Sequence, residues 1–264
     1  MKGSRRLLLA GGLLALAAPH RAKAADGSLE RILAAEMLRA GMLPAPAPLS
    51  FVNAAGEPDG LSAAIAEVLA SGLGVRLRLE VLDPRQNREA ALLEGRVDVL
   101  LSGPPISVSA AKRMMFTDAF AGAPLMLVAP HGVALAHDAA SGRPRIATAS
   151  SEGLANPASL GIAPGATPRQ IASPQDALSC MVSGECDAAI LPEFAARWIS
   201  ETDARMEERA VVGQAWFGAA VRQGEHELWR ALNGILELAA AEGLLQALHR
   251  SYLGRPLPEN RPRF

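Results

Sequence analysis

The sequence predicts an α/β fold in which a mostly parallel sheet is flanked by helices. Between residues 37 and 101, apolar segments typical of strands alternate with segments whose apolar residues recur at helical spacing. A strand–helix–strand–helix–strand order of this kind places parallel strands side by side through crossover helices. The last of these strands, residues 97–101, is a short branched apolar run, which is typical of a strand covered on both faces.

Local patterns place the elements of this first half. Three prolines between residues 44 and 48 exclude a helix there, because proline removes a backbone donor and restricts the residue before it. Gly72 and Gly74 end the first long helix. We expect a leader segment over residues 25–34, strands over 37–43, 75–82 and 97–101, and helices over 60–73 and 87–94.

The second half predicts a second unit that is connected twice to the first. Residues 124–128 (PLMLV) cross to this unit, and a polar connection follows over 131–144. Three prolines and two glycines predict an irregular path over residues 155–169. We expect strands over residues 145–148 and 186–191, helices over 174–183, 193–199 and 227–252 with a break at Gly243, and a tail over 255–264.

Residues 1–24 carry the features of a secretory signal peptide. A basic start precedes an apolar stretch from Leu7 to Ala18, and Ala22-Lys23-Ala24 fits the cleavage rule. The paired arginines before the apolar stretch leave the general secretion route and the twin-arginine route both open. The segment holds five of the 26 basic residues and none of the 27 acidic ones, so the mature chain has a net charge of −6. This charge disfavours nucleic acid as a partner.

The sequence contains two cysteines, Cys180 and Cys186, on either side of a turn at Gly184. Two cysteines are too few for a structural zinc site. In an oxidising compartment they form a local disulfide across the turn, and a pair of buried free thiols is the alternative. The histidines are scattered, so we expect neither a metal nor a cofactor.

The segment from Gly95 to Phe120 (GRVDVLLSGPPISVSAAKRMMFTDAF) resembles the periplasmic solute-binding proteins of polar amino-acid ABC transporters, bacterial family 3. The family's usual wording here is G-x-V-D-x-x-x-S-G-M-T-I-T-P-E-R-A-K-x-x-x-F-T-D-P-Y. Weaker matches at both ends extend the resemblance over about residues 36–254. The positions in register are Gly95, Val97, Asp98, Ser102, Gly103, Ile106, Ser107, Ala111, Lys112, Phe116, Thr117, Asp118 and Phe120.

The resemblance implies a two-lobed fold of the periplasmic-binding-protein type II class. Each lobe would be a mostly parallel sheet flanked by helices. Lobe I would contain residues 25–127 and 214–264, and lobe II would contain residues 128–213. The two lobes would close over a ligand about hinges near residues 124–130 and 212–215.

The chain departs from the family at the positions that hold an amino acid. By resemblance, the arginine that forks onto the α-carboxylate corresponds to Ala110, and the aspartate that takes the α-ammonium corresponds to Pro192. Removing one partner of a buried charge pair costs about 2–5 kcal/mol, so the loss of both argues against tight binding of an ordinary α-amino acid. Lys112 and Arg113 either replace the missing arginine or face solvent.

Mostly neutral groups remain as candidates for the ligand site. Ser102 and Gly103 follow a strand, and ligands of open α/β sheets bind at such ends; a plain turn is the alternative. Ser150 and Ser151 either hydrogen-bond a ligand or form a turn, and Glu193 either replaces the aspartate or favours a helix start. The full candidate set is Ser102, Gly103, Ser107, Ser150, Ser151, Glu193, and Leu49 near the position of a stacking aromatic residue.

The resemblance implies a periplasmic substrate-binding protein that closes on a small polar solute and presents it to an ABC permease in the inner membrane. We expect no enzymatic activity, because the dehydratases among the relatives need the arginine and the acid that Ala110 and Pro192 replace. The rival hypothesis is an accessory protein that serves a periplasmic redox enzyme and has a degenerate ligand pocket. We expect a monomer.

Overall fold

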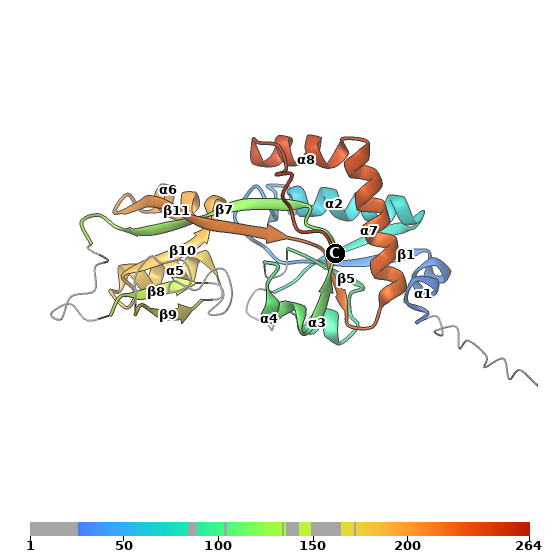
Figure 1. The fold of residues 1–264 in the computed structure, drawn as a ribbon, viewed down its shortest axis with the longest axis horizontal. Coiled ribbons are helices and arrows are strands. Elements are labelled where there is room, and N and C mark those ends of the chain that lie inside the picture. Colours follow the sequence, from blue (N-terminus) through green and yellow to red (C-terminus); the bar gives the residue numbers. More distant parts are fainter. Residues whose placement is uncertain are drawn as a thin grey trace, which may run out of the picture.

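The computed structural model describes residues 26–83, 89–102, 105–133, 135, 143–148, 165–171 and 173–264. Within these ranges, two lobes, each a sheet with helices packed against it, are joined by a pair of long strands (Figure 1). The two-lobed α/β class expected from the sequence is therefore confirmed. The signal-peptide segment 1–24, Gly103, Ser150 and Ser151 lie outside the described residues.

Lobe I contains a five-stranded sheet with the order β4-β1-β5-β12-β6. In it, β1 (Met37–Met42) pairs in parallel with β4 (Arg76–Val81) and β5 (Val99–Leu101), and β12 (Ala220–Arg222) runs antiparallel between β5 and β6 (Met114–Phe116). A short hairpin of β2 (Phe51–Val52) and β3 (Pro58–Asp59) follows β1. The helices of this lobe are α1 (Ser28–Ala35), α2 (Leu61–Leu73), α3 (Ala90–Leu93), α4 (Val108–Ala111), α7 (His226–Ala241) and α8 (Leu244–Leu253).

Lobe II contains the second five-stranded sheet, with the order β11-β7-β10-β8-β9. In it, β8 (Arg145–Thr148) pairs in parallel with β9 (Thr167–Gln170) and with β10 (Ala188–Pro192). The other two strands, β7 (Ala121–Pro130) and β11 (Met206–Phe217), complete the sheet. An apolar cluster under α5 (Pro174–Val182) and α6 (Glu193–Thr202) joins both helices to the sheet, with Ala177, Met181, Ala195 and Ile199 among its buried members.

The connection between the lobes is the antiparallel pair β7–β11. The two strands pair from Phe217 and Ala121 to Met206 and Pro130, and they lead into β12 and β6 of the first sheet. Where the pair enters lobe I, the indole of Trp216 packs directly on Gly122. A side chain at position 122 would not fit, because its Cβ atom would lie 2.5 Å from Cζ3 of the indole. The predicted lobe boundaries, 127/128 and 213/214, fall inside these strands and stay a prediction.

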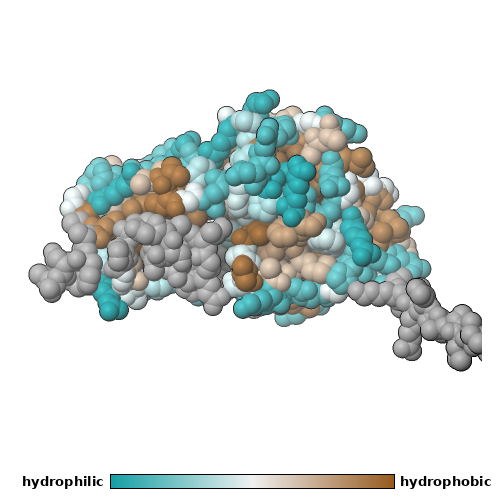
Figure 2. Space-filling view, in the orientation of Figure 1, coloured by the Kyte–Doolittle hydropathy of each residue, from teal (hydrophilic) through white to brown (hydrophobic). Residues whose placement is uncertain are grey.

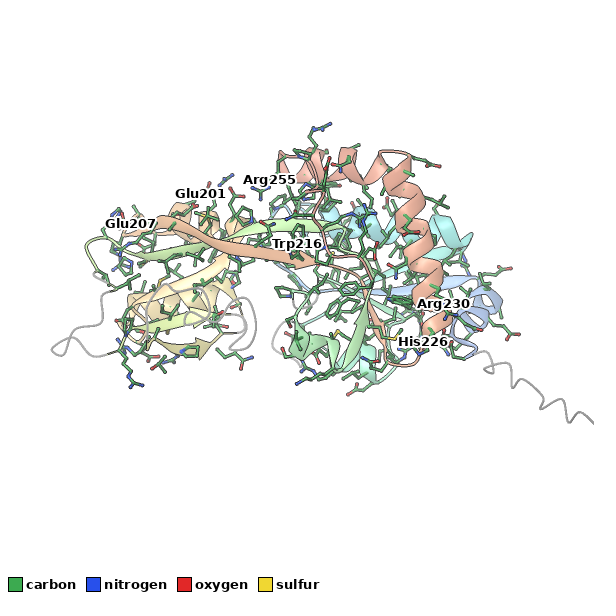
Figure 3. All side chains as sticks on the ribbon, viewed as in Figure 1. Glu201, Glu207, Trp216, His226, Arg230 and Arg255 are labelled. Atoms are coloured by element: carbon green, nitrogen blue, oxygen red, sulfur yellow. A yellow bond between two sulfur atoms is a disulfide. The ribbon has the colours of Figure 1, made fainter. Side chains whose placement is uncertain are left out.

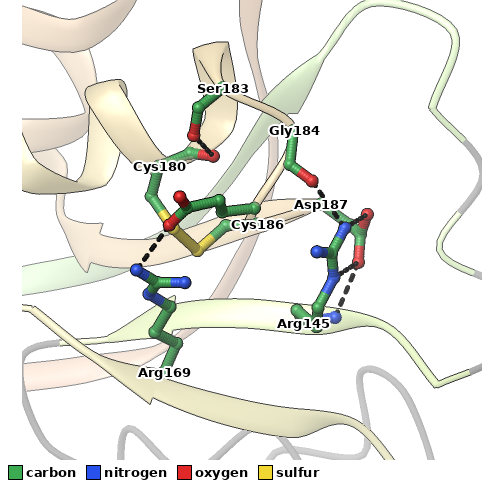
Figure 4. The surroundings of a disulfide bond; sticks show 8 residues. Arg145, Arg169, Cys180, Ser183, Gly184, Cys186 and Asp187 are labelled. Atoms are coloured by element: carbon green, nitrogen blue, oxygen red, sulfur yellow. Dashed lines mark hydrogen bonds and ion pairs between the residues drawn. A yellow bond between two sulfur atoms is a disulfide. The ribbon is translucent and has the colours of Figure 1, made fainter.

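The same arginine–aspartate clamp joins two parallel strands in each lobe. In lobe I, Asp98 accepts hydrogen bonds from the backbone N–H of Arg39 (3.1 Å) and from its guanidinium (2.9 and 2.6 Å). In lobe II, Asp187 accepts from the backbone N–H of Arg145 (2.7 Å) and from its guanidinium (3.3 and 3.1 Å; Figure 4). Each aspartate N–H donates in return to the arginine C=O at 2.8 Å. The two lobes thus repeat the same arginine–aspartate contact between neighbouring parallel strands.

A disulfide links the end of α5 to the start of β10. Cys180 and Cys186 are bonded, with their Cα atoms 5.2 Å apart, and both side chains are buried. The turn between them contains Gly184, whose φ of +71° favours glycine. Next to the disulfide, Glu185 forms an exposed ion pair with Arg169 of β9 (Figure 4).

The structure differs from the sequence-based expectations in three segments. Residues 28–35 form a helix instead of a leader, because Ile32 packs into the lobe I core. Residues 167–170 form a strand instead of an irregular path, because β8 provides a parallel partner. The C-terminal segment 255–264 is packed against lobe I: Leu257 and Arg261 are buried, and the N–H of Phe264 donates to Asp118 at 2.7 Å.

Candidate ligand site between the lobes

The strand directions place the carboxyl ends of the parallel strands of the two lobes opposite each other. Because β7 runs from lobe I into lobe II, its antiparallel neighbour β10 runs back toward lobe I, and β8 runs with β10. In lobe I, β12 continues β11 away from lobe II, so β5 and β1 run toward lobe II. Ligands of open α/β sheets bind outside such ends. We call the two opposed strand ends the inter-lobe face.

Neutral side chains occupy the described strand ends of the inter-lobe face. They are Met42, Leu101, Ser102, Thr148 and Pro192. Figure 2 shows apolar and near-neutral surface in the middle of the molecule, on the lobe I side. The adjoining segments 103–104 and 149–164 contain no lysine or arginine in the sequence. None of these positions therefore provides a cationic side chain for a carboxylate.

Two serine hydroxyls meet at the end of β5. Ser102 has a φ of +58°, in the left-handed region, and its hydroxyl donates to the hydroxyl of Ser62. Ser62 lies in the first turn of α2, and its N–H donates to the C=O of Leu49 at 2.9 Å. Non-glycine residues in this region cost about 1–3 kcal/mol and cluster at functional sites. Ser62 is not among the candidates that the sequence offers, so its contact with Ser102 is visible in the structure alone.

Two other candidates have structural contacts within lobe I. Leu49 is 2% exposed and packs into the apolar core, so its side chain is not offered to a ligand in this arrangement. The hydroxyl of Ser107 accepts the N–H of Ala110 at 3.3 Å and caps α4. Next to it, the N–H of Ile106 donates to the C=O of Trp216 at 2.8 Å. This bond ties the loop before α4 to β11, at the junction of the lobes.

The cations near the position of the missing arginine, Lys112 and Arg113, lie on the surface of lobe I. Ala110, at the position of the family's arginine, is 2% exposed and belongs to an apolar cluster of lobe I. Arg113 makes two 2.6 Å hydrogen bonds to the carboxylate of Glu89 and donates to the C=O of Ser109. Lys112 is exposed at the C-terminus of α4. The alternative in which these two residues face outward therefore agrees with the structure.

Glu193, the remaining charged candidate, is engaged by two arginines. It is the first residue of α6, directly after β10. Its carboxylate oxygens lie 3.3 Å from Arg197 Nη2 and 2.6 Å from Arg255 Nη2. Figure 3 shows Arg255 between α6 and α8. The carboxylate of Glu193 is thus paired with two cations in this arrangement, and a role for Glu193 in place of the family's aspartate stays a prediction.

The comparison with known families decides the assignment. The chain matches the model of the bacterial extracellular solute-binding proteins, family 3, over residues 38–255. The chain belongs to this family. Membership confirms the resemblance seen in the sequence and agrees with a protein that binds a small solute. No curated protein sequence shows significant similarity to this family-3 chain.

Solved structures share the fold at low sequence identity. Tv2483 bound to L-arginine aligns with a TM-score of 0.73 at 18% identity, over 88% of this chain and 97% of its own. A histidine kinase sensor domain with similarity to periplasmic binding proteins aligns with a TM-score of 0.68 at 23% identity, over 84% and 98%. The ancestral amino acid-binding protein AncCDT-1, a precursor of cyclohexadienyl dehydratase, aligns with a TM-score of 0.67 at 22% identity, over 85% and 99%. At these identities, the likeness shows the fold alone.

Two further observations concern the described part of the chain. None of its helices combines the length and the apolar character that a membrane span requires. It also contains no group of three or more histidine, cysteine or acidic side chains that could hold a metal ion. The description of family 3 names its members as bacterial extracellular solute-binding proteins.

Proposed function

We propose that this family-3 chain is the periplasmic substrate-binding component of an ABC transporter. The observation that supports this most directly is the arrangement of two lobes, joined by β7 and β11, whose parallel strands end opposite each other. Such a pair of lobes can close over a solute by bending of the two connecting strands. A closed protein with bound solute would then be presented to a permease in the inner membrane.

We propose further that the solute is small, polar and not an ordinary amino acid. Ala110 supplies no cation for an α-carboxylate, Pro192 supplies no acid for an α-ammonium, and Glu193 is paired with arginines. Each lost charge partner is worth about 2–5 kcal/mol, which corresponds to about 1.5–3.5 decades in affinity. Ser102 is 9% exposed at the end of β5, so its hydroxyl instead supports recognition of a neutral hydrogen-bonding group, while the fully buried hydroxyl of Ser62 accepts from it and positions it.

Thermal unfolding of the mature chain, residues 25–264, across a solute panel tests this proposal. The panel contains amino acids, organic acids, amines and polyols. A ligand at 100 times its dissociation constant stabilises the protein by about 2.7 kcal/mol, which a melting curve detects. We expect a shift with a non-amino-acid solute, and a smaller shift in Ser62→Ala. The matched control is Ser71→Ala, which changes an exposed serine of the same helix.

The outcomes separate the hypotheses. Micromolar binding of a standard amino acid would overturn the proposed ligand class. If the solute raises the melting temperature equally in Ser62→Ala and Ser71→Ala, the hydroxyl pair does not take part in binding. No shift with any solute, together with co-purification of a dehydrogenase instead of a permease, would favour the rival accessory function.

A further inference from the structure

An ion pair connects the two lobes directly after Pro192, at the end of β10. Glu193 Oε2 of lobe II lies 2.6 Å from Arg255 Nη2, which follows α8 of lobe I. The side chains are 26% and 32% exposed, so solvent screens the pair only partly. By contrast, the ion pairs of Arg145, Arg169 and Arg209 stay within lobe II.

Both ends of the ion pair are held by their own lobe. On lobe I, Nδ1 of His249 contacts the C=O of Arg255 at 2.7 Å. Two hydrogen bonds between Gln246 and the backbone of Leu257, at 3.1 and 2.9 Å, fix the segment after Arg255 on α8. On lobe II, Glu193 directly follows β10 and is the first residue of α6, whose buried side chains pack against the sheet. The distance between the carboxylate of Glu193 and the guanidinium of Arg255 therefore depends on the relative position of the lobes.

The ion pair lies on the opposite side of the connecting strands from α4 and β9. In Figure 1, α6 and α8 lie above the β7–β11 pair, whereas α4 and β9 lie below it. If the lobes rotate about these strands so that α4 and β9 approach, α6 and α8 must move apart. Such a rotation lengthens the distance between Glu193 and Arg255.

We propose that the Glu193–Arg255 ion pair is a latch that stabilises the present arrangement of the lobes against closure. The latch lowers the population of the closed form without touching a ligand, so it would set the apparent affinity for any solute. A partly exposed ion pair shifts a two-state equilibrium by up to about fivefold. This inference goes beyond the transport function and does not depend on it, because lobe closure can be measured without a solute.

Distances between two spin labels on the mature, ligand-free chain test the latch. Val108→Cys on α4 and Val182→Cys on α5 place the labels on different lobes, at side chains that are 76% and 48% exposed. The native cysteines are bonded to each other and do not react with the label. The variants to compare are Glu193→Gln, Arg255→Gln, the exchange Glu193→Arg with Arg255→Glu, and Arg197→Gln as the matched control.

Arg197→Gln is the control because it removes an ion pair of the same carboxylate within lobe II, four residues along α6. We expect Glu193→Gln and Arg255→Gln each to raise the fraction of short label distances by up to about fivefold. The exchange should restore the original distribution, and Arg197→Gln should leave it unchanged. The latch is overturned if both single variants keep the original distribution, if Arg197→Gln shifts it equally, or if the exchange fails to restore it.

Discussion

Replacing Asp98 with asparagine should destabilise the protein more than the same replacement of Asp187. Both carboxylates bind the backbone N–H and the guanidinium of an arginine in the neighbouring strand. The difference between them is burial, because the side chain of Asp98 is 2% exposed and that of Asp187 is 31% exposed. Asp98 also has a second guanidinium nearby, that of Arg222 at 3.8 Å. The comparison therefore measures how burial, together with the second cation, changes the contribution of one repeated clamp.

The magnitudes follow from the surroundings of each pair. Removing one partner of a buried ion pair costs about 3–5 kcal/mol, and asparagine keeps one acceptor, so we expect about 2–3 kcal/mol for Asp98→Asn. Exposed pairs contribute about 0.2–1 kcal/mol, so we expect at most about 1 kcal/mol for Asp187→Asn. With a urea slope of about 3 kcal/mol/M, the midpoints fall by about 1 M and by about 0.3 M or less.

Urea unfolding followed by far-UV circular dichroism and by tryptophan fluorescence measures both midpoints. Two probes are needed, because a two-lobed chain can unfold in more than one step. Burial raises the pKa of Asp187, but the hydrogen bonds from Arg145 outweigh it, so this pKa lies below its usual value of 3.8. The cost of Asp187→Asn should therefore be constant above that value and shrink as the pH falls below it. Equal midpoints for the two variants would refute the reasoning from burial.

Three further predictions concern other parts of the fold. Burial lowers the pKa of His249, so below about pH 6.5 the imidazole is protonated in the unfolded state and stays neutral in the folded state. The wild type should therefore lose stability between about pH 7.5 and about pH 5.5, and His249→Gln should lose less. The prediction is contradicted if the urea midpoint depends on pH in the same way in both proteins. Replacing Cys180 and Cys186 with serine should lower the free energy of unfolding by about 2 kcal/mol, and a melting curve like that of the wild type would count against it. Deleting residues 258–264 removes the contacts of buried Arg261 with Ala119 and should lower the urea midpoint by an amount equivalent to about 2 kcal/mol; the prediction fails if the midpoint stays the same.

Much of the fold could be predicted from local patterns. The strands 37–42 and 145–148 and the helices 61–73 and 174–182 coincide with the expected segments within one or two residues, because their periodicity and their glycine or proline ends are local properties. The strand β9 could not be predicted in this way. Residues 167–170 contain a proline and three polar residues, and they become a strand because β8 offers an unpaired edge.

For the candidate site as well, the sequence shows the residue types at fixed motif positions but not the contacts between distant residues. The sequence shows that Ala110 and Pro192 stand where charged residues are expected, since this depends only on the motif in register. It does not show that Ser62 contacts Ser102, because these residues come from different elements and are 40 positions apart. It also leaves Glu193 open between two roles, and it does not show that Glu193 pairs with Arg255.

The sequence by itself determined the family and the two-lobed α/β class, and it places Ala110 where the family's motif has arginine, because each of these follows from residue types at fixed spacing. The tertiary structure alone decided which side chains meet: the two serines at the end of β5, the packed C-terminal segment, and the carboxylate of Glu193 on a lobe I arginine. The physical reason is that such contacts join residues far apart in the chain, and the pairing of distant groups depends on burial and on the relative position of whole elements.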